Sequence, residues 1–260
     1  MTYVHAQRAE DFIPTLEDAS VNLVLTDPPY FGIVEDHWDN QWPNERAFAE
    51  WLSGIFLSLL PKITPTGSLV FFGAMGKHGS HPLFRVVTAL EDNGYTFRQW
   101  VTWRKRRAYG KSNDYLYVRE EILWFSKSGE PNDVTFNKPY TDELRGYAGW
   151  DDKYQAHSEY KRVGNVWTDI DPVIDDIPEL FKPSRSCQKP EKLMDRLVST
   201  HSNKGDLIVD PFAGWGSTGV SAVSMGRDFV GCEAIEQDAV AADLRVSRAV
   251  VVTHPLLEGT

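Results

Sequence analysis

Two short segments, far apart in this 260-residue chain, combine residue types that can do chemistry. The first is Asp27-Pro28-Pro29-Tyr30. Each proline fixes φ and removes an N–H donor, so this segment should be a stiff loop with free carbonyls, one carboxylate and one aromatic face. Such a loop suits a planar amine, because the Asp27 carboxylate and the Pro28 carbonyl can each accept a hydrogen bond from an NH₂ group while Tyr30 stacks on the ring.

The exocyclic amine of a nucleobase is a poor nucleophile, because its lone pair is delocalised into the ring. Two acceptors can draw the nitrogen toward a tetrahedral geometry and stabilise charge on it as it attacks, which combines electrostatic preorganisation with positioning. This chemistry requires neither a metal ion nor a covalent intermediate. For a lone motif of this kind, the alternative is a rigid turn without a chemical role.

The second segment is the glycine-rich run Asp210-Pro211-Phe212-Ala213-Gly214-Trp215-Gly216-Ser217-Thr218, which with Gly219 fits the pattern G-x-G-x-x-G. Glycines let the backbone turn tightly and approach a ligand closely. About 20 residues further on, Glu233 is placed to accept hydrogen bonds from ribose hydroxyls. The pattern therefore indicates an adenosine-bearing cofactor. A dinucleotide fold needs two mononucleotide-binding halves, so a smaller nucleoside cofactor fits better.

Both segments follow β-branched, apolar runs that are typical of buried strands, at residues 22–26 and 207–209. In an open α/β sheet, ligands bind just beyond the carboxyl ends of such strands. We therefore expect one segment to form a reaction site and the other to form a cofactor cradle, at the same edge of one sheet.

The rest of the chain alternates between strand and helix patterns. Asn44 is predicted to cap a helix that ends at Pro61. Further strands are predicted over 68–72, 95–103, 120–125, 206–209 and 228–232, and further helices over 81–92, 190–201, 218–225 and 237–249. Between residues 127 and about 186 the periodicity fades over a stretch too long for an ordinary connection, which predicts a functional insertion. The alternation predicts an α/β fold, a mostly parallel sheet with helices on both faces.

The composition is typical of a globular protein, with 42% hydrophobic and 25% charged residues. No apolar stretch is long enough to span a membrane, and the N-terminus lacks a secretory signal, so we expect a cytoplasmic protein. Two cysteines, Cys187 and Cys232, form neither a disulfide framework nor a metal cluster by themselves. The histidines show no metal-ligand spacing, and we expect no metal site.

The net charge of −10 is unfavourable for binding nucleic acid through overall charge. The charges are unevenly distributed, however. The basic residues of one segment have few acids among them: Arg98, Arg104, Lys105, Arg106, Arg107, Lys111 and Arg119. The average charge can therefore hide a basic face.

In this order, the motifs resemble those of the β group of amino-methylating DNA methyltransferases, which use S-adenosylmethionine. In that group the catalytic segment comes first, the target-recognition region lies in the middle, and the cofactor segment comes last, a circularly permuted order within a Rossmann-like methyltransferase fold. The resemblance covers almost the whole chain. It rests on the catalytic motif at 27–30, Gln188-Lys189-Pro190 at the start of the cofactor half, the methionine-binding loop at 210–218 and the ribose-binding strand at 229–233. Trp215 departs from the family pattern, which has a small residue there.

The resemblance implies a division of the chain and a role for particular residues. Residues 1–127 would be the catalytic half, 128–185 the target-recognition insertion, and 186–260 the S-adenosylmethionine-binding half of the same domain. Catalysis is assigned to Asp27, Pro28, Pro29 and Tyr30. Cofactor binding is assigned to Asp210, Phe212, Ala213, Gly214, Gly216, Ser217, Thr218, Glu233, Lys189 and Pro190.

The resemblance also implies a substrate. The acid at Asp27 favours adenine N6, since cytosine-N4 enzymes more often have Ser there. The adenine must be flipped out of double-stranded DNA, with basic residues holding the flanking phosphates. The candidates lie on a loop expected after Trp103: Arg104, Lys105, Arg106, Arg107 and Lys111.

Base readout is expected from the 128–185 insertion, through Tyr140, Arg145, Tyr147, Trp150, Lys153, Tyr154, Lys161 and Arg162. A homodimer and a cognate restriction enzyme are compatible with this interpretation. Cytosine-N4 methylation, an RNA or protein substrate, and an inactive DNA-binding relative are the alternatives.

Overall fold

A computed structural model describes residues 2–32, 41–74, 80–109, 115–130, 132–144, 159–172 and 188–249, except for the side chains of 106–109. Within these residues, eight strands form one sheet in the order β1-β10-β9-β2-β3-β5-β4-β8. The strands are β1 (Val4–Ala6), β2 (Val21–Thr26), β3 (Ile63–Gly73), β4 (Thr96–Tyr109), β5 (Tyr117–Ser126), β8 (Val166–Trp167), β9 (Leu207–Asp210) and β10 (Asp228–Glu233). Two further strands, β6 (Tyr140–Leu144) and β7 (Tyr160–Arg162), pair with each other.

The predicted mostly parallel sheet is confirmed. Strands β1, β10, β9, β2 and β3 run parallel to one another. β5 is antiparallel to both β3 and β4, and β8 is parallel to β4. As a consequence, the carboxyl ends of β10, β9, β2, β3 and β4 lie at one edge of the sheet, where β5 begins. We call this edge the carboxyl edge.

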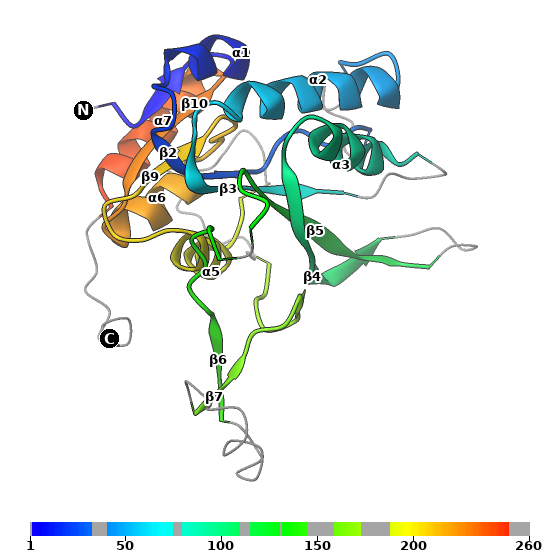
Figure 1. Ribbon diagram of the computed structural model, residues 1–260, viewed down its shortest axis with the longest axis vertical. Coiled ribbons are helices and arrows are strands. Elements are labelled where there is room, and N and C mark those ends of the chain that lie inside the picture. Colours follow the sequence, from blue (N-terminus) through cyan, green and yellow to red (C-terminus); the bar gives the residue numbers. More distant parts are fainter. Residues whose placement is uncertain are drawn as a thin grey trace.

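Helices cover both faces of the sheet (Figure 1). One face packs against α1 (Ala9–Phe12), the 3₁₀ turn η1 (Ile13–Thr15), α2 (Glu45–Leu59) and α3 (Pro82–Asp92). The other face packs against α5 (Glu191–His201), α6 (Ser217–Ser224) and α7 (Glu236–Ser247). Along β2, Val24 belongs to the first core, and Leu23 and Leu25 belong to the second. A strand with apolar residues on both faces is what a two-sided helical cover requires.

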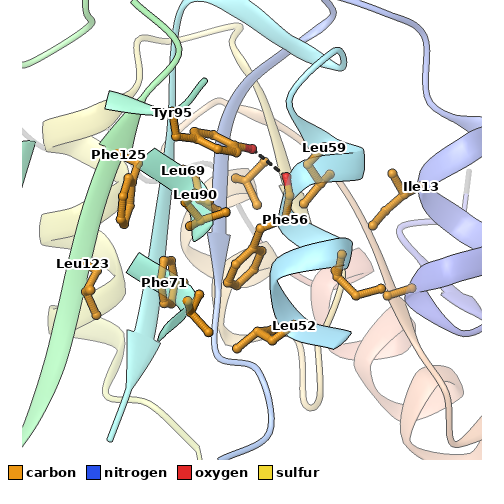
Figure 2. Close-up of a cluster of buried hydrophobic side chains, with 14 of the residues drawn as sticks. Ile13, Leu52, Phe56, Leu59, Leu69, Phe71, Leu90, Tyr95, Leu123 and Phe125 are labelled. Carbon is orange, nitrogen blue, oxygen red and sulfur yellow. Dashed lines mark hydrogen bonds between the residues drawn. The ribbon is translucent and has the colours of Figure 1, made fainter. Parts of the chain in front are cut away.

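The core beneath α2 and α3 is rich in aromatic residues (Figure 2). The ring of Phe56 on α2 lies 4.5 Å from that of Phe71 on β3, which stacks on Phe125 of β5 at 5.9 Å. Tyr95 places its hydroxyl in this core and donates a hydrogen bond to the Phe56 carbonyl at 2.8 Å. Burial raises the pKa of Tyr95, so the phenol stays neutral and its polar atom is satisfied.

The helix boundaries follow the predicted signals. Asn44 accepts a hydrogen bond from the Ala47 N–H at 2.9 Å, as an N-cap should. After α3 the chain turns at Gly94, whose φ of 102° is in the region that favours glycine. The start of β3 differs from the prediction. β3 begins at Ile63 rather than at residue 68, because a register shift between β2 and β3 lets the strand start early.

The predicted insertion is only partly separate from the main sheet. The β6–β7 pair projects away from it (Figure 1). β8, however, pairs with β4, and the buried Trp103 donates a hydrogen bond to the Ile170 carbonyl at 2.9 Å. This middle region therefore contributes a strand to the large sheet. None of the described helices is both long and apolar enough to cross a membrane.

Candidate active site

The two chemical segments are neighbours in space. β2 and β9 are adjacent parallel strands, with Leu23 opposite Ile208 and Val24 opposite Val209. At their carboxyl ends, the Thr26 hydroxyl donates a hydrogen bond to Asp210 Oδ1 at 2.6 Å. From β2 the chain continues to β3 on one side, and from β9 it continues to β10 on the other, so the segments lie at the switch point where such sheets bind ligands. The expectation of a shared edge is confirmed.

Asp27 presents a carboxylate that is held at both oxygens. Tyr30 Oη donates to Oδ1 at 2.5 Å, and Lys189 Nζ donates to Oδ2 at 2.5 Å. The Asp27 side chain is 25% exposed, so it remains accessible. Each carboxylate oxygen has two lone pairs, and these contacts leave capacity for a further donor such as an amine.

Lys189 lies just before α5 and contacts a second acid besides Asp27. Its Nζ is also 3.2 Å from Glu120 Oε2 and 4.8 Å from the ring centroid of Phe72. The other oxygen of Glu120 pairs with Lys105 of β4. Four side chains therefore form a row of alternating charge, Asp27, Lys189, Glu120 and Lys105, which we call the charge row.

Sequence reasoning missed Glu120. It stands at the strand end that meets the carboxyl edge, because β5 runs antiparallel to β3 with Glu121 opposite Gly73. The signal that could have revealed it was the pair of adjacent acids, Glu120 and Glu121, in an otherwise apolar strand. Both are buried, and an acid is rarely buried without a partner.

The glycine-rich loop has the backbone that close contact with a ligand requires. Gly214 and Gly216 have φ values of 50° and 73°, in the left-handed region. A Cβ on Gly216 would lie 2.9 Å from Val246 Cγ2, so the loop packs tightly on α7. At Gly214 no atom lies closer than 4.0 Å to an added Cβ, so this part of the loop faces open space. A cradle of this shape fits an elongated ligand lying across the loop.

Glu233 ends β10 beside this loop. Its Oε2 accepts a hydrogen bond from the Gly214 N–H at 3.2 Å, and its Oε1 accepts one from the Ile235 N–H at 3.0 Å. The side chain is half-buried, so part of it can be reached from outside. Gln7 lies next to it, with its backbone N–H donating to the Glu233 carbonyl at 3.1 Å.

Asp210 organises the loop from below. Besides Thr26, it accepts hydrogen bonds from the Phe212 N–H at 3.0 Å and the Thr218 hydroxyl at 2.6 Å. Burial raises the pKa of Asp210 to about 6, with hydrogen bonds from Thr218, Thr26 and Phe212 lowering it and the charge of Asp27 raising it. The Asp210 and Thr218 side chains thus bond to each other inside the protein.

The rest of the loop is held by its neighbours. The Ala213 N–H donates to the Cys232 carbonyl at 2.9 Å, and the ring of Phe212 lies 5.7 Å from that of Trp51 on α2. Ser217 is buried at the start of α6. Pro190 caps α5.

Arg245 is a second residue that the sequence analysis missed. From α7 it donates to the carbonyl of Trp215 at 3.1 Å and to Glu191 Oε1 at 3.2 Å. The guanidinium therefore ties the loop to the first turn of α5. No local signal identifies an arginine in this role, because its partners come from other parts of the chain.

One prediction about the basic segment is wrong. Residues 104–107 lie within β4, not on a loop, because the hairpin ladder with β5 continues past Trp103 to the pair Tyr109 and Tyr117. Arg104 is exposed opposite Arg119, whereas Lys105 bonds to Glu120. The side chains of Arg106 and Arg107, and all of Lys111, lie outside the described residues.

Of the residues expected to read bases, those within the described ranges lie on the β6–β7 pair: Tyr140, Lys161 and Arg162. Arg145, Tyr147, Trp150, Lys153 and Tyr154 lie outside those ranges.

Within the described parts of the chain, no group of three or more His, Cys, Asp or Glu side chains could hold a metal ion. Cys232 is a buried thiol that donates to the Pro211 carbonyl at 3.2 Å, and burial raises its pKa. A thiol in such surroundings is unreactive, so we interpret Cys232 as a packing residue. Cys187 lies outside the described residues.

A permuted Rossmann-like sheet with an acidic Pro-Pro-Tyr loop beside a glycine-rich loop defines the class of amino methyltransferases. Comparison with known proteins gives the family. The model N6_N4_Mtase, described as DNA methylase, matches residues 21–242, and the chain belongs to this family. Over 245 residues it is 27% identical to the type II methyltransferase M1.MboII of Moraxella bovis, covering 88% of this chain and 90% of that one.

Solved structures agree on the fold. TTHA0409 of Thermus thermophilus, described as a DNA modification methylase, has a TM-score of 0.64 at 26% identity and covers 96% of both chains. It has also been solved in complex with S-adenosyl-L-methionine. The PvuII DNA methyltransferase, described as cytosine-N4-specific, has a TM-score of 0.70 at 17% identity, covering 93% of this chain and 85% of that one.

Proposed function

We propose that this protein methylates the N6 amine of a flipped-out adenine in duplex DNA, with S-adenosylmethionine as methyl donor. The observation that carries the proposal is the contact between the two segments. The hydrogen bond from Thr26 to Asp210 at 2.6 Å places the Asp27 loop directly beside the glycine-rich loop. A base at the first loop and a donor at the second would therefore share one space.

The glycine-rich loop would hold the donor. Its methionine part would lie along Gly214 and Gly216, which have no side chain to block a close approach to the backbone, and its ribose would face the half-buried Glu233. Asp210, Ser217 and Thr218 would act by shaping the loop. S-adenosylmethionine supplies an electrophilic methyl group on a sulfonium ion.

The Asp27 loop would hold the base. The Asp27 carboxylate and the Pro28 carbonyl would accept hydrogen bonds from the amine and stabilise the positive charge that grows on its nitrogen. Tyr30 would stack on the ring, which requires its hydroxyl to leave Asp27 Oδ1. The hydrogen bond between these two side chains is thus one that the substrate replaces.

The choice of adenine is supported by the acid at position 27. The fold does not choose the base, since it is shared with a protein described as cytosine-N4-specific. Lys189 and Pro190 stay predictions as cofactor residues, and the Lys189 ammonium lies against Asp27.

For DNA binding we propose the hairpin formed by β4 and β5, which extends past the carboxyl edge (Figure 1). The exposed Arg104 faces outward at its base, and Tyr115 near its tip is 97% exposed. Phosphate contacts from Arg104, Arg106, Arg107 and Lys111 stay predictions, as do a homodimer, a cognate restriction enzyme and a cytoplasmic location.

The test is a labelling experiment. The protein is incubated with methyl-labelled S-adenosylmethionine and a random-sequence duplex library, so that every short target is represented, and the nucleosides are analysed by mass spectrometry. We expect N6-methyladenine, and none with the Asp27→Ala variant, while calorimetry shows that this variant still binds S-adenosylmethionine. N4-methylcytosine would overturn the choice of base. Absence of label in DNA, with the cofactor bound, would overturn the choice of substrate.

A further inference from the structure

The Lys189 ammonium lies between two carboxylates from different parts of the chain. Its distance is 2.5 Å to Asp27 Oδ2, beyond the end of β2, and 3.2 Å to Glu120 Oε2 on β5. The Lys189 and Glu120 side chains are 9% and 10% exposed, whereas that of Asp27 is 25% exposed. Both ends of the charge row are therefore more exposed than its middle, with Lys105 at 31%, and the base would bind at the Asp27 end.

The four charges of the charge row balance one another. Asp27 is faced by Lys189, by the Tyr30 hydroxyl and, across the sheet edge, by the buried Asp210. Glu120 is faced by Lys189 and Lys105. Two acids and two lysines alternate, so each buried charge has an opposite neighbour. Removing one member would leave a partner buried without compensation.

The contact with Lys189 also orients Asp27. Because the ammonium occupies Oδ2, the plane of the carboxylate is held, and Oδ1 is left for the Tyr30 hydroxyl or for an incoming amine. An acceptor that is oriented in advance needs no reorganisation at the moment of reaction.

The contact of Lys189 with Glu120 affects how strong an acceptor Asp27 is. An ammonium paired with Asp27 alone would draw charge from the carboxylate and make it a weaker hydrogen-bond acceptor. Because Glu120 shares the same ammonium, Asp27 is weakened less.

We propose that Lys189 and Glu120 are positioning residues for methyl transfer: Lys189 holds the Asp27 carboxylate oriented, and Glu120 shares the lysine so that Asp27 stays a strong acceptor. This inference rests on the proposed function, because it assigns to Asp27 the amine of the substrate. It differs from the cofactor-binding role expected for Lys189, since neither acid that it contacts belongs to the glycine-rich loop.

The two residues are expected to act on Asp27 in different ways. In Lys189→Met the group that holds Oδ2 is lost, whereas Lys189→Arg keeps a cation that can donate to Oδ2. In Glu120→Gln the ammonium stays on Asp27 but loses its second acid. A merely structural role would give no such difference between the three variants.

The test measures kcat, KM and S-adenosylmethionine affinity for the three variants. For Lys189→Met we expect kcat to fall about 10²–10³-fold, the loss typical of a preorganised group, with a smaller change in KM. For Lys189→Arg we expect part of this kcat to be restored, and for Glu120→Gln we expect a smaller fall in kcat. S-adenosylmethionine affinity should change less than about threefold in each.

The double variant separates charge from geometry. Lys189→Met with Glu120→Gln removes one cation and one anion, so the net charge of the charge row is kept while Oδ2 is no longer held, and kcat should stay as low as in Lys189→Met. Two controls are matched to the changes. Lys192→Met alters an exposed lysine on the same helix, and Glu121→Gln alters the adjacent buried acid, which bonds to Trp100 and Thr102 instead.

A second readout does not depend on turnover. Carbon-13 labelling of aspartate carboxyl groups, with the Asp27 signal assigned by its loss in Asp27→Asn, reports on this carboxylate in the protein without DNA at one fixed pH. A displaced Asp27 signal in Lys189→Met, displaced less in Glu120→Gln and not in the controls, would support the inference even if the unmodified protein methylated another substrate. An Asp27 signal that stays in place in Lys189→Met would overturn it. A large loss of S-adenosylmethionine affinity in Lys189→Met with an unmoved Asp27 signal would instead show a cofactor-binding lysine.

Discussion

Replacing Thr218 with valine should destabilise the protein more at alkaline than at mildly acidic pH. The Thr218 hydroxyl bonds to Asp210 Oδ2 at 2.6 Å, and Asp210 is buried with a pKa of about 6 rather than 3.8. Valine has nearly the same shape as threonine but cannot donate. The substitution therefore removes one hydrogen bond and leaves the packing almost unchanged.

The expected magnitude follows from the charge state of Asp210. Ionising this carboxyl in the folded protein costs roughly 3 kcal/mol, from the difference between about 6 and 3.8 at about 1.36 kcal/mol per pKa unit. A hydrogen bond to a charged group contributes about 1.5–3 kcal/mol, and one to a neutral group about 0.5–1.5 kcal/mol. At pH 8.5 Asp210 is ionised, so we expect a loss of about 2 kcal/mol. At pH 5.5 it is about three-quarters protonated, and we expect about 1 kcal/mol.

The assay is urea unfolding of both proteins at pH 8.5 and pH 5.5. Because the folded pKa of Asp210 is above its unfolded value, the ionisation cost is absent below about pH 3.8 and fully present above about pH 6. Thr88→Val is the control, since this exposed threonine bonds only to the Phe84 carbonyl of its own helix. An equal loss at both pH values would refute the reasoning, and so would no loss at pH 8.5.

Three further predictions concern the loop, the acid beside it and a buried histidine. Gly216→Ala should lower the free energy of unfolding by about 2–4 kcal/mol, because it adds a clash with Val246 to the strain of a positive φ. The control Gly205→Ala, at φ 82° with open space around it, should lower it by only about 1 kcal/mol, and equal losses in thermal unfolding would exclude the packing component. Glu233→Ala should weaken S-adenosylmethionine binding about 10–100-fold by calorimetry, with Glu236→Ala as the exposed control, and an unchanged dissociation constant would refute its ribose role. Burial lowers the pKa of His201 from 6.5 to about 3, so the protein loses stability as the pH falls from about 6.5 toward 3 and this histidine becomes protonated. The loss reaches about 1.4 kcal/mol at pH 5.5. His201→Phe should remove this part of the acid sensitivity, and an unchanged pH dependence of unfolding would contradict the prediction.

Much of the architecture could be predicted from local patterns. The apolar runs before Asp27 and Asp210, the cap at Asn44 and the turn at Gly94 are signals contained in a few adjacent residues. They depend on propensity, capping and backbone conformation, which act over one or two turns of chain. For this reason most strands of the sheet, and most helices that cover it, could be placed to within a few residues. The carboxyl edge could be predicted as the place of the candidate active site.

The error in β4 has a different origin. A run of basic residues after Trp103 looks like a solvated loop, but a hairpin can extend beyond the sheet wherever two strands continue to pair. The partner strand, from Tyr117 onward, decides where β4 ends. A pattern within one segment contains no information about how far its partner continues.

By itself, then, the sequence of this DNA methylase determined which two segments are the candidates for the chemistry and that each follows a buried strand. Only the tertiary structure decided that β2 lies next to β9, with Thr26 bonded to Asp210, 184 residues further on. It also decided that Lys189 is shared between Asp27 and Glu120, two acids from different strands. The physical reason is that strand order and the pairing of buried charges minimise the free energy of the whole packed core, and no single segment of the chain encodes them.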